Sequence, residues 1–145
     1  MREVIAVSAC LLGYNCKYNG KNNFNPKLVK QLKDNIVLPI CPEEFGGMTT
    51  PRIPSEIQKD GRILNEIGQD VSCCFQRGLL VTLEMMRQHQ STKAILKDGS
   101  PSCGFTQIYD GTFTNTKMEG MGVTAKHLLQ NGVTILNMQV ESALR

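Results

Sequence analysis

Six cysteines in 145 residues are the feature of this sequence that most needs a chemical explanation. Their share of the chain lies well below the roughly 8–10% typical of a small disulfide-stapled domain. Three of them, Cys10, Cys41 and Cys103, each follow a short apolar run. Sites with cysteine ligands alone suit zinc or an iron–sulfur cluster. These three residues therefore point to a shared metal or catalytic site.

The spacing of the cysteines argues against the simplest metal sites. The chain has neither the paired Cys-x-x-Cys motifs of a zinc ribbon nor a ferredoxin-like cysteine run. A site with three cysteines leaves one metal position open to a substrate, which favours catalysis. Two alternatives stay open. One is a non-catalytic iron–sulfur or metal-binding module, such as a sulfur carrier or sensor, and the other is a metal-free enzyme with Cys10 or Cys103 as its nucleophile.

Polar residues beside these cysteines support the catalytic interpretation. Glu43 and Glu44 follow Cys41, and a carboxylate near a metal can act as a general base towards water. Ser100 and Ser102 precede Cys103 and supply hydroxyl groups that can orient water or a substrate. Each pair also has a structural explanation, since glutamates are usually solvated and Ser-Pro-Ser is a common turn composition.

The remaining cysteines and the histidines have weaker indications. Cys16 lies six residues after Cys10, and a fourth ligand, a resolving thiol and a residue without a role are all open for it. Cys73 and Cys74 fall in the first turn of a long predicted helix, where core packing is the favoured role. His89 and His127 lie on predicted helices away from the sheet edge of Cys10, Cys41 and Cys103, and we assign them no function.

Alternating strands and helices explain how distant cysteines can meet. Four apolar runs predict strands, and three periodic segments predict helices. The strands are 4–9, 36–40, 93–97 and 133–136, and the helices are 26–35, a long segment capped by Asp70, and 122–131. This order predicts an α/β fold, a small Rossmann-like three-layer sandwich with a mainly parallel sheet of about four strands. Cys10, Cys41 and Cys103 then lie near the carboxyl ends of strands, the ligand edge of such sheets.

Two excursions interrupt this alternation. Asp60-Gly61, between short apolar segments, predicts a small hairpin with a type I′ turn. Residues 108–114, with Asp110-Gly111 inside, predict another excursion from the sheet. Pro39 cannot donate a hydrogen bond, which favours an edge position for strand 36–40.

Length and charge limit the remaining possibilities. The length predicts a single domain over residues 1–145. No apolar run is long enough to span a membrane and the N-terminus does not resemble a secretory signal, so we expect a cytoplasmic protein with reduced thiols. The net charge of +3 is too small to indicate nucleic-acid binding. The stretch from Lys17 to Lys33 has five lysines and no acidic residue, and a solvated surface is the favoured interpretation over a patch that binds an anion. The same basic stretch leaves thiolated RNA open as a less favoured substrate. The sequence gives no indication of the oligomeric state.

Several segments, in order along nearly the whole chain, resemble one bacterial family. The most specific are 100–104 (SPSCG) and 108–113 (IYDGTF), together with 7–13 (VSACLLG), 41–43 (CPE), 51–54 (PRIP) and 122–125 (GVTA). The family is that of the thiouracil desulfurases, small proteins long labelled as a domain of unknown function. The sequence departs from the usual pattern at Lys17-Tyr18-Asn19-Gly20, where Arg-Tyr-Asp-Gly is common.

The resemblance implies an enzyme with a [4Fe-4S] cluster held by Cys10, Cys41 and Cys103 alone. It implies non-redox desulfuration of a thiolated pyrimidine, thiouracil or a related thionucleobase, to uracil and sulfide. Substrate sulfur would bind the open iron while water attacks the ring carbon. By position, Glu43 resembles the carboxylate that activates the water and Ser100 the assisting hydroxyl, with Ser102 as the less favoured choice.

Overall fold

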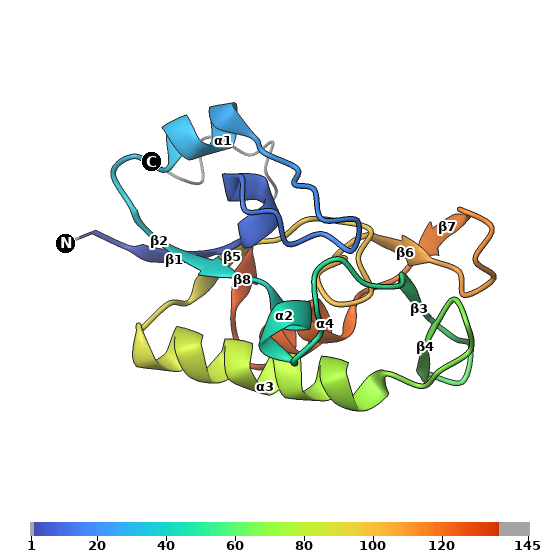
Figure 1. The fold of residues 1–145 in the computed structure, drawn as a ribbon. Helices are drawn as coiled ribbons and strands as arrows, with labels where there is room; N and C mark the ends of the chain where they lie inside the picture. The colour runs from blue at the N-terminus through green and yellow to red at the C-terminus, as the bar shows by residue number, and fades with distance from the viewer. Residues whose placement is uncertain (1, 137–145) are drawn as a thin grey trace.

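A four-stranded parallel sheet forms the centre of the molecule, in a computed structural model that describes residues 2–136 (Figure 1). Its order is β2-β1-β5-β8 and each neighbouring pair is parallel. The strands are β1 (Val4–Ser8), β2 (Ile36–Ile40), β5 (Lys93–Ile95) and β8 (Thr134–Ile135). The predicted α/β class and all four predicted strands are therefore confirmed.

Helices cover both faces of this sheet, which confirms the predicted three layers (Figure 1). Helix α1 (Pro26–Gln31) packs on one face, and α3 (Ser72–Gln88) and α4 (Val123–Gln130) pack on the other. Successive side chains of a strand point to opposite faces. Ile5 and Val7 accordingly join a core cluster with Leu28 of α1, whereas Ala6 joins a cluster with Met86 of α3.

The helix boundaries differ from prediction in two places. The Asn25 side chain accepts the backbone N–H of Leu28, as expected of an N-cap, but α1 ends at Gln31 and not near Asn35. The chain has to turn there to enter β2. Helix α3 begins at Ser72, and Asp70 supports its start by accepting the backbone N–H of Ser72 without occupying the cap position itself.

Two small antiparallel hairpins lie beside the sheet. They are β3 (Ser55–Ile57) with β4 (Ile63–Asn65), and β6 (Gln107–Tyr109) with β7 (Lys117–Glu119). The type I′ prediction is wrong, because a five-residue loop joins β3 to β4, and within it only Gly61 has a positive φ. The second hairpin extends beyond the predicted 108–114 excursion.

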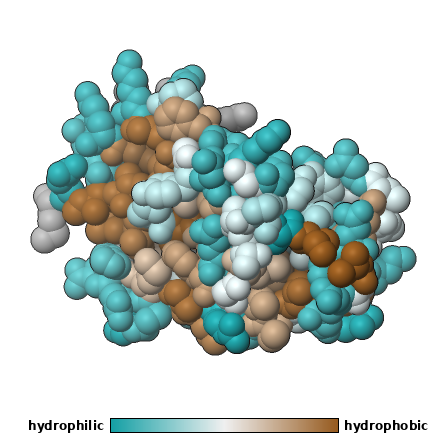
Figure 2. All heavy atoms as spheres, viewed as in Figure 1, coloured by the Kyte–Doolittle hydropathy of each residue, from teal (hydrophilic) through white to brown (hydrophobic). Residues whose placement is uncertain are grey.

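Strand β2 lies at the sheet edge, as Pro39 predicts. Apolar side chains reach the surface near this edge, where Ile36 is 48% exposed (Figure 2). Among residues 2–136, no helix has the length and apolar character needed to cross a membrane.

The strand order determines where a ligand site belongs. In sequence order the strands are arranged 2-1-3-4, so the chain moves outwards from β1 to β2 and then crosses to the other side at β5. Such a reversal opens a crevice at the carboxyl ends of the two strands that flank it, which is where doubly wound sheets bind ligands. Short elements occupy these ends: η1 (Ala9–Leu12) follows β1, and α2 (Pro42–Phe45) follows β2.

Candidate active site at the carboxyl edge of the sheet

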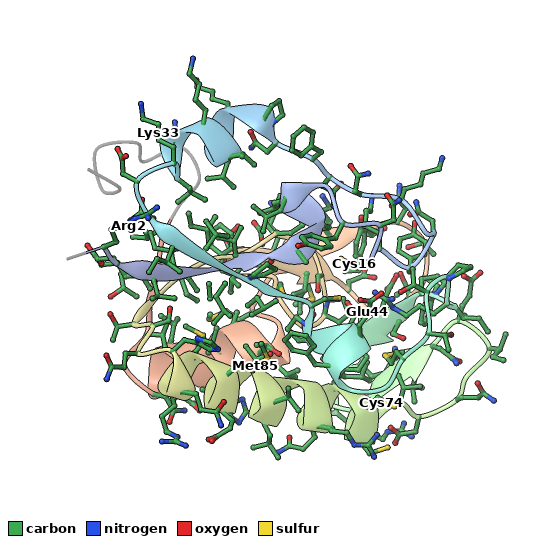
Figure 3. The ribbon with its side chains drawn as sticks, turned by 60° about the vertical axis from the view of Figure 1, so that its left-hand side comes forward. Arg2, Cys16, Lys33, Glu44, Cys74 and Met85 are labelled. Atoms are coloured by element: carbon green, nitrogen blue, oxygen red, sulfur yellow. The ribbon has the colours of Figure 1, made fainter. Side chains whose placement is uncertain are left out.

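Four cysteines line one cavity of about 360 Å³ at this edge. Cys10 lies in η1, Cys41 immediately precedes α2, Cys103 lies in the loop after β5, and Cys16 lies in the loop that follows η1. In Figure 3, Cys16 and Glu44 lie at the end of the sheet where β1 and β2 terminate, with Arg2 and Lys33 at the opposite end. The structure thus brings together the three cysteines that sequence selected and adds Cys16.

Cys10, Cys16 and Cys41 form one hydrogen-bonded group of thiols. A hydrogen bond with Cys16 lowers the pKa of Cys10 to about 6 against the opposing effect of burial, and the Asn23 amide contributes from 3.5 Å. Cys16 likewise lowers the pKa of Cys41, although burial opposes this. The pKa of Cys16 itself is raised, because its thiol hydrogen bonds with Cys10 and Cys41 favour the protonated form. The lowered pKa values of Cys10 and Cys41 therefore favour the thiolate, the form that binds metals.

Cys103 has a different environment. Burial raises its pKa to about 12, although hydroxyl groups of Ser8 and Ser102 lower it in part, and the charge of Glu43 raises it further. The Ser102 Oγ to Cys103 Sγ distance is 3.6 Å. A buried thiol of this kind ionises when a metal supplies the missing positive charge.

These thiols fit a multi-atom group with soft metal ions. Thiolate donors select zinc or iron–sulfur clusters over hard cations. The cavity is far larger than the roughly 10–15 Å³ needed to hold one water molecule, so it has room for a group of several atoms. Within residues 2–136, no group of three or more His, Cys, Asp or Glu side chains is arranged to hold a single metal ion.

Glu43 lies beside the thiols, in the first turn of α2. Its Oε2 atom accepts a hydrogen bond from Ser102 Oγ at 3.3 Å, and its Oε1 atom lies 3.2 Å from Arg52 Nε. Its side chain is 16% exposed and lines the cavity. Glu44, the next residue, is exposed and bonds to Thr50 instead. The structure therefore separates two glutamates that are equivalent in sequence.

Ser100 and Ser102 form a hydrogen-bonded pair next to this carboxylate. Their Oγ atoms are 2.8 Å apart, and Ser100 Oγ accepts the backbone N–H groups of Ser102 and Cys103, each at 3.0 Å. With both amides donating to it, Ser100 directs its own hydrogen to Ser102, which donates to Glu43. Ser102 contacts the Glu43 carboxylate directly, whereas Ser100 stabilises the turn at residues 100–103 through its bonds to backbone N–H groups.

Sequence reasoning missed several residues of this site. Arg52 pairs with Glu43, and Asn23 donates to Cys10. The β6–β7 hairpin, expected only as an excursion, forms a wall of the cavity with Tyr109 and Lys117. The only sequence signal for Arg52 was the PRIP segment, which indicated a resemblance to the family but no chemical role for the arginine.

The predicted core role of Cys73 is wrong. Cys73 is exposed and Cys74 is only half-buried, near the start of α3 (Figure 3). The buried stripe of α3 includes Phe75, Leu79 and Met86. Cys73 falls outside this stripe. Neither of these cysteines nor His89 or His127 lines the cavity.

Fold and site together define a small parallel α/β protein with a thiol-lined cavity and adjoining carboxylate and hydroxyl groups. The model of the 2-thiouracil desulfurase family matches residues 5–139. The chain therefore belongs to the 2-thiouracil desulfurase family, a family of enzymes, and the resemblance seen in its motifs is confirmed.

Two individual proteins are similar over nearly their whole length. The uncharacterized protein YbbK of Bacillus subtilis (strain 168) is 36% identical over 143 residues, which cover 92% of this chain and 95% of YbbK. The solved structure of the [4Fe-4S]-dependent thiouracil desulfidase TudS is 37% identical, with a TM-score of 0.87. That likeness covers 94% of this chain and 91% of TudS.

Proposed function

We propose that this enzyme removes sulfur from a thiolated pyrimidine, 2-thiouracil or a related thionucleobase, by hydrolysis without net electron transfer. The observation that carries the proposal is the contact of the Glu43 carboxylate with Ser102 inside a cavity lined by four thiols. Family membership and the likeness to TudS support the same reaction.

Cys10, Cys41 and Cys103 would hold a [4Fe-4S] cluster. Their thiol donor set and the size of the cavity suit such a group, and the low pKa of Cys10 favours the ligating form. When bound, the cluster supplies a soft iron position that takes up sulfur. A set of three cysteines leaves that position for the substrate, and Cys16 stays a hydrogen-bonding neighbour.

Glu43 is the general base of the proposed reaction. Its carboxylate accepts a proton from a water molecule, whose oxygen attacks the ring carbon that carries sulfur. The carbon gains this oxygen and loses sulfur as sulfide, so the substrate and water yield a pyrimidine and hydrogen sulfide. Ser100 and Ser102 keep the carboxylate oriented. Both oxygens of Glu43 retain a lone pair for water after their bonds to Arg52 and Ser102.

Anaerobic turnover of 2-thiouracil by the Glu43→Gln variant tests this proposal. The wild-type protein should contain about four irons and four sulfides and release uracil. Glu43→Gln should keep its iron and visible spectrum and lose roughly 10²- to 10⁴-fold in kcat, the usual contribution of a general base. Glu44→Gln is the matched control, because Glu44 does not line the cavity.

Three outcomes would contradict the proposal in different ways. A protein that stays free of iron after anaerobic reconstitution contradicts the cluster, and turnover by such a protein supports a metal-free cysteine enzyme. Normal turnover by Glu43→Gln contradicts the base. A wild-type protein that holds iron without releasing uracil supports a sulfur carrier or sensor.

A further inference from the structure

We propose that Arg52 is a positioning residue that holds the Glu43 carboxylate in the orientation required for turnover. The inference rests on the proposed function, because it concerns the carboxylate that activates water there. Arg52 lies in the PRIP segment, whose function the motifs alone leave unexplained.

The Arg52 guanidinium is nearly inaccessible, with 6% of the side chain exposed, and its bonds extend in several directions. Its Nε atom lies 3.2 Å from Glu43 Oε1, and Nη2 donates to the carbonyl of Cys16 at 2.9 Å. Nη1 donates to the Thr49 carbonyl at 3.2 Å and to Thr50 Oγ1 at 2.9 Å. One side chain thus joins α2 to the loop of Cys16 and to the segment before Pro51.

The ion pair between Arg52 and Glu43 is largely buried, so each charge depends on the other. A buried guanidinium without a counter-charge is costly, so Glu43 and Arg52 constrain each other. The second oxygen of Glu43 is held by Ser102. The carboxylate is therefore restrained through both oxygens. Arg52, in the segment that follows α2, holds one oxygen, and Ser102, in the loop after β5, holds the other.

Lysine cannot reproduce this arrangement. The planar guanidinium presents donors in a rigid fork, whereas an ammonium group is a compact point charge on a flexible stem. Arg52→Lys preserves the positive charge but cannot hold Glu43, the Cys16 carbonyl and the Thr49–Thr50 segment in one geometry. A displacement of about 1 Å in a reacting group can cost on the order of 10²-fold in rate.

A double-mutant cycle separates positioning from general structural support. The proteins are wild type, Glu43→Gln, Arg52→Lys and the double variant, with Arg62→Lys as control, since Arg62 forms an exposed pair with Asp60. All are loaded with iron and sulfide anaerobically and assayed with 2-thiouracil for kcat, KM, iron content and visible spectrum. Melting temperature and an Arg52→Gln variant test for loss of folding.

Arg52→Lys should lower kcat by roughly ten- to a hundredfold, with KM changed less than about twofold and iron content unchanged. In the Glu43→Gln background it should cause no further loss, because its effect passes through the missing carboxylate. An equal fold loss in both backgrounds, an unchanged kcat, or loss of iron in Arg52→Lys and Arg52→Gln alike would overturn the inference.

A crystal structure of Arg52→Lys supplies a readout that does not depend on activity. Glu43 should move away from Ser102, and an unmoved carboxylate would contradict a positioning role. Failure of the proposed function has a separate signature, since it appears as absent turnover in wild type or as normal turnover in Glu43→Gln alone.

Discussion

The four thiols of the cavity differ in their electrostatic surroundings. Cys16 shares its hydrogen with Cys10 and Cys41, which lowers the pKa of both neighbours and raises its own. Cys103 lies apart from this group, beside the Ser102 hydroxyl, and is buried. The four cysteines therefore differ in environment, although all four have the same side chain.

Replacing single cysteines should separate ligands from the neighbour. Cys10→Ala should lower iron content roughly tenfold or more after anaerobic reconstitution, because it removes a ligand. Cys16→Ser should retain most of the iron, because no ligand is removed and the serine hydroxyl can still donate its hydrogen to Cys10 or Cys41. Iron and acid-labile sulfide per chain measure both effects. Loss of iron in Cys16→Ser to the level of Cys10→Ala would show that Cys16 is itself a ligand.

At the scale of elements, a close contact between α2 and α3 places Glu43. A Cβ atom on Gly78 of α3 would lie 1.9 Å from the carbonyl oxygen of Pro42, and one on Gly46 would lie 2.0 Å from the carbonyl oxygen of Cys74. Neither backbone can yield without moving a helix. The two glycines therefore set the distance between α3 and the short helix that carries the proposed base.

Gly78→Ala should destabilise the protein by about 1–3 kcal/mol, the usual cost of overpacking. At an unconstrained helix position the same change would stabilise by roughly 0.5–1 kcal/mol, so the sign of the effect is informative. Urea denaturation measures it, with the exposed Gln76→Ala on the same helix as control. A Gly78→Ala protein as stable as wild type would contradict the close contact.

Over the whole molecule, Asp98 links the sheet to the β6–β7 hairpin. Its Oδ1 atom accepts backbone N–H groups of Gly99, Phe105, Thr106 and Gln107. Burial alone would raise the pKa of Asp98, but hydrogen bonds from Thr106, Gln107 and Phe105 outweigh it and lower the pKa from 3.8 to about 2. The ionised carboxylate thus organises the loop that presents Ser100, Ser102 and Cys103.

Asp98 should make the fold less stable in acid. Its folded-state pKa is depressed, so its contribution is complete above the unfolded pKa of 3.8 and disappears as the pH falls through about 2. Asp98→Asn should cost about 1 kcal/mol at pH 7, a value reduced for solvent screening of a partly buried group. Denaturation between pH 7 and pH 2 should show the difference from wild type shrinking towards acid. A difference that does not vary with pH would exclude the charge as its cause.

Periodicity and composition suffice to predict the strands, the three-layer arrangement and the meeting of Cys10, Cys41 and Cys103. These features follow from continuous apolar runs, from the helical periodicity between them and from the rule that parallel strands end at a common edge. Glu43 and the two serines were predicted because they adjoin those cysteines in the chain.

Contacts between distant segments were decided only by the tertiary structure. Arg52 reaches the carbonyl of Cys16, 36 residues away, and the Cys16 thiol bonds with two other cysteines. Glu44 lies outside the cavity, although the sequence treats it and its neighbour Glu43 alike, and Cys73 is exposed, although it and Cys74 were both predicted to pack in the core. Sequence patterns show which residues share an edge or a face, but side-chain direction and pairing across loops depend on how the elements pack.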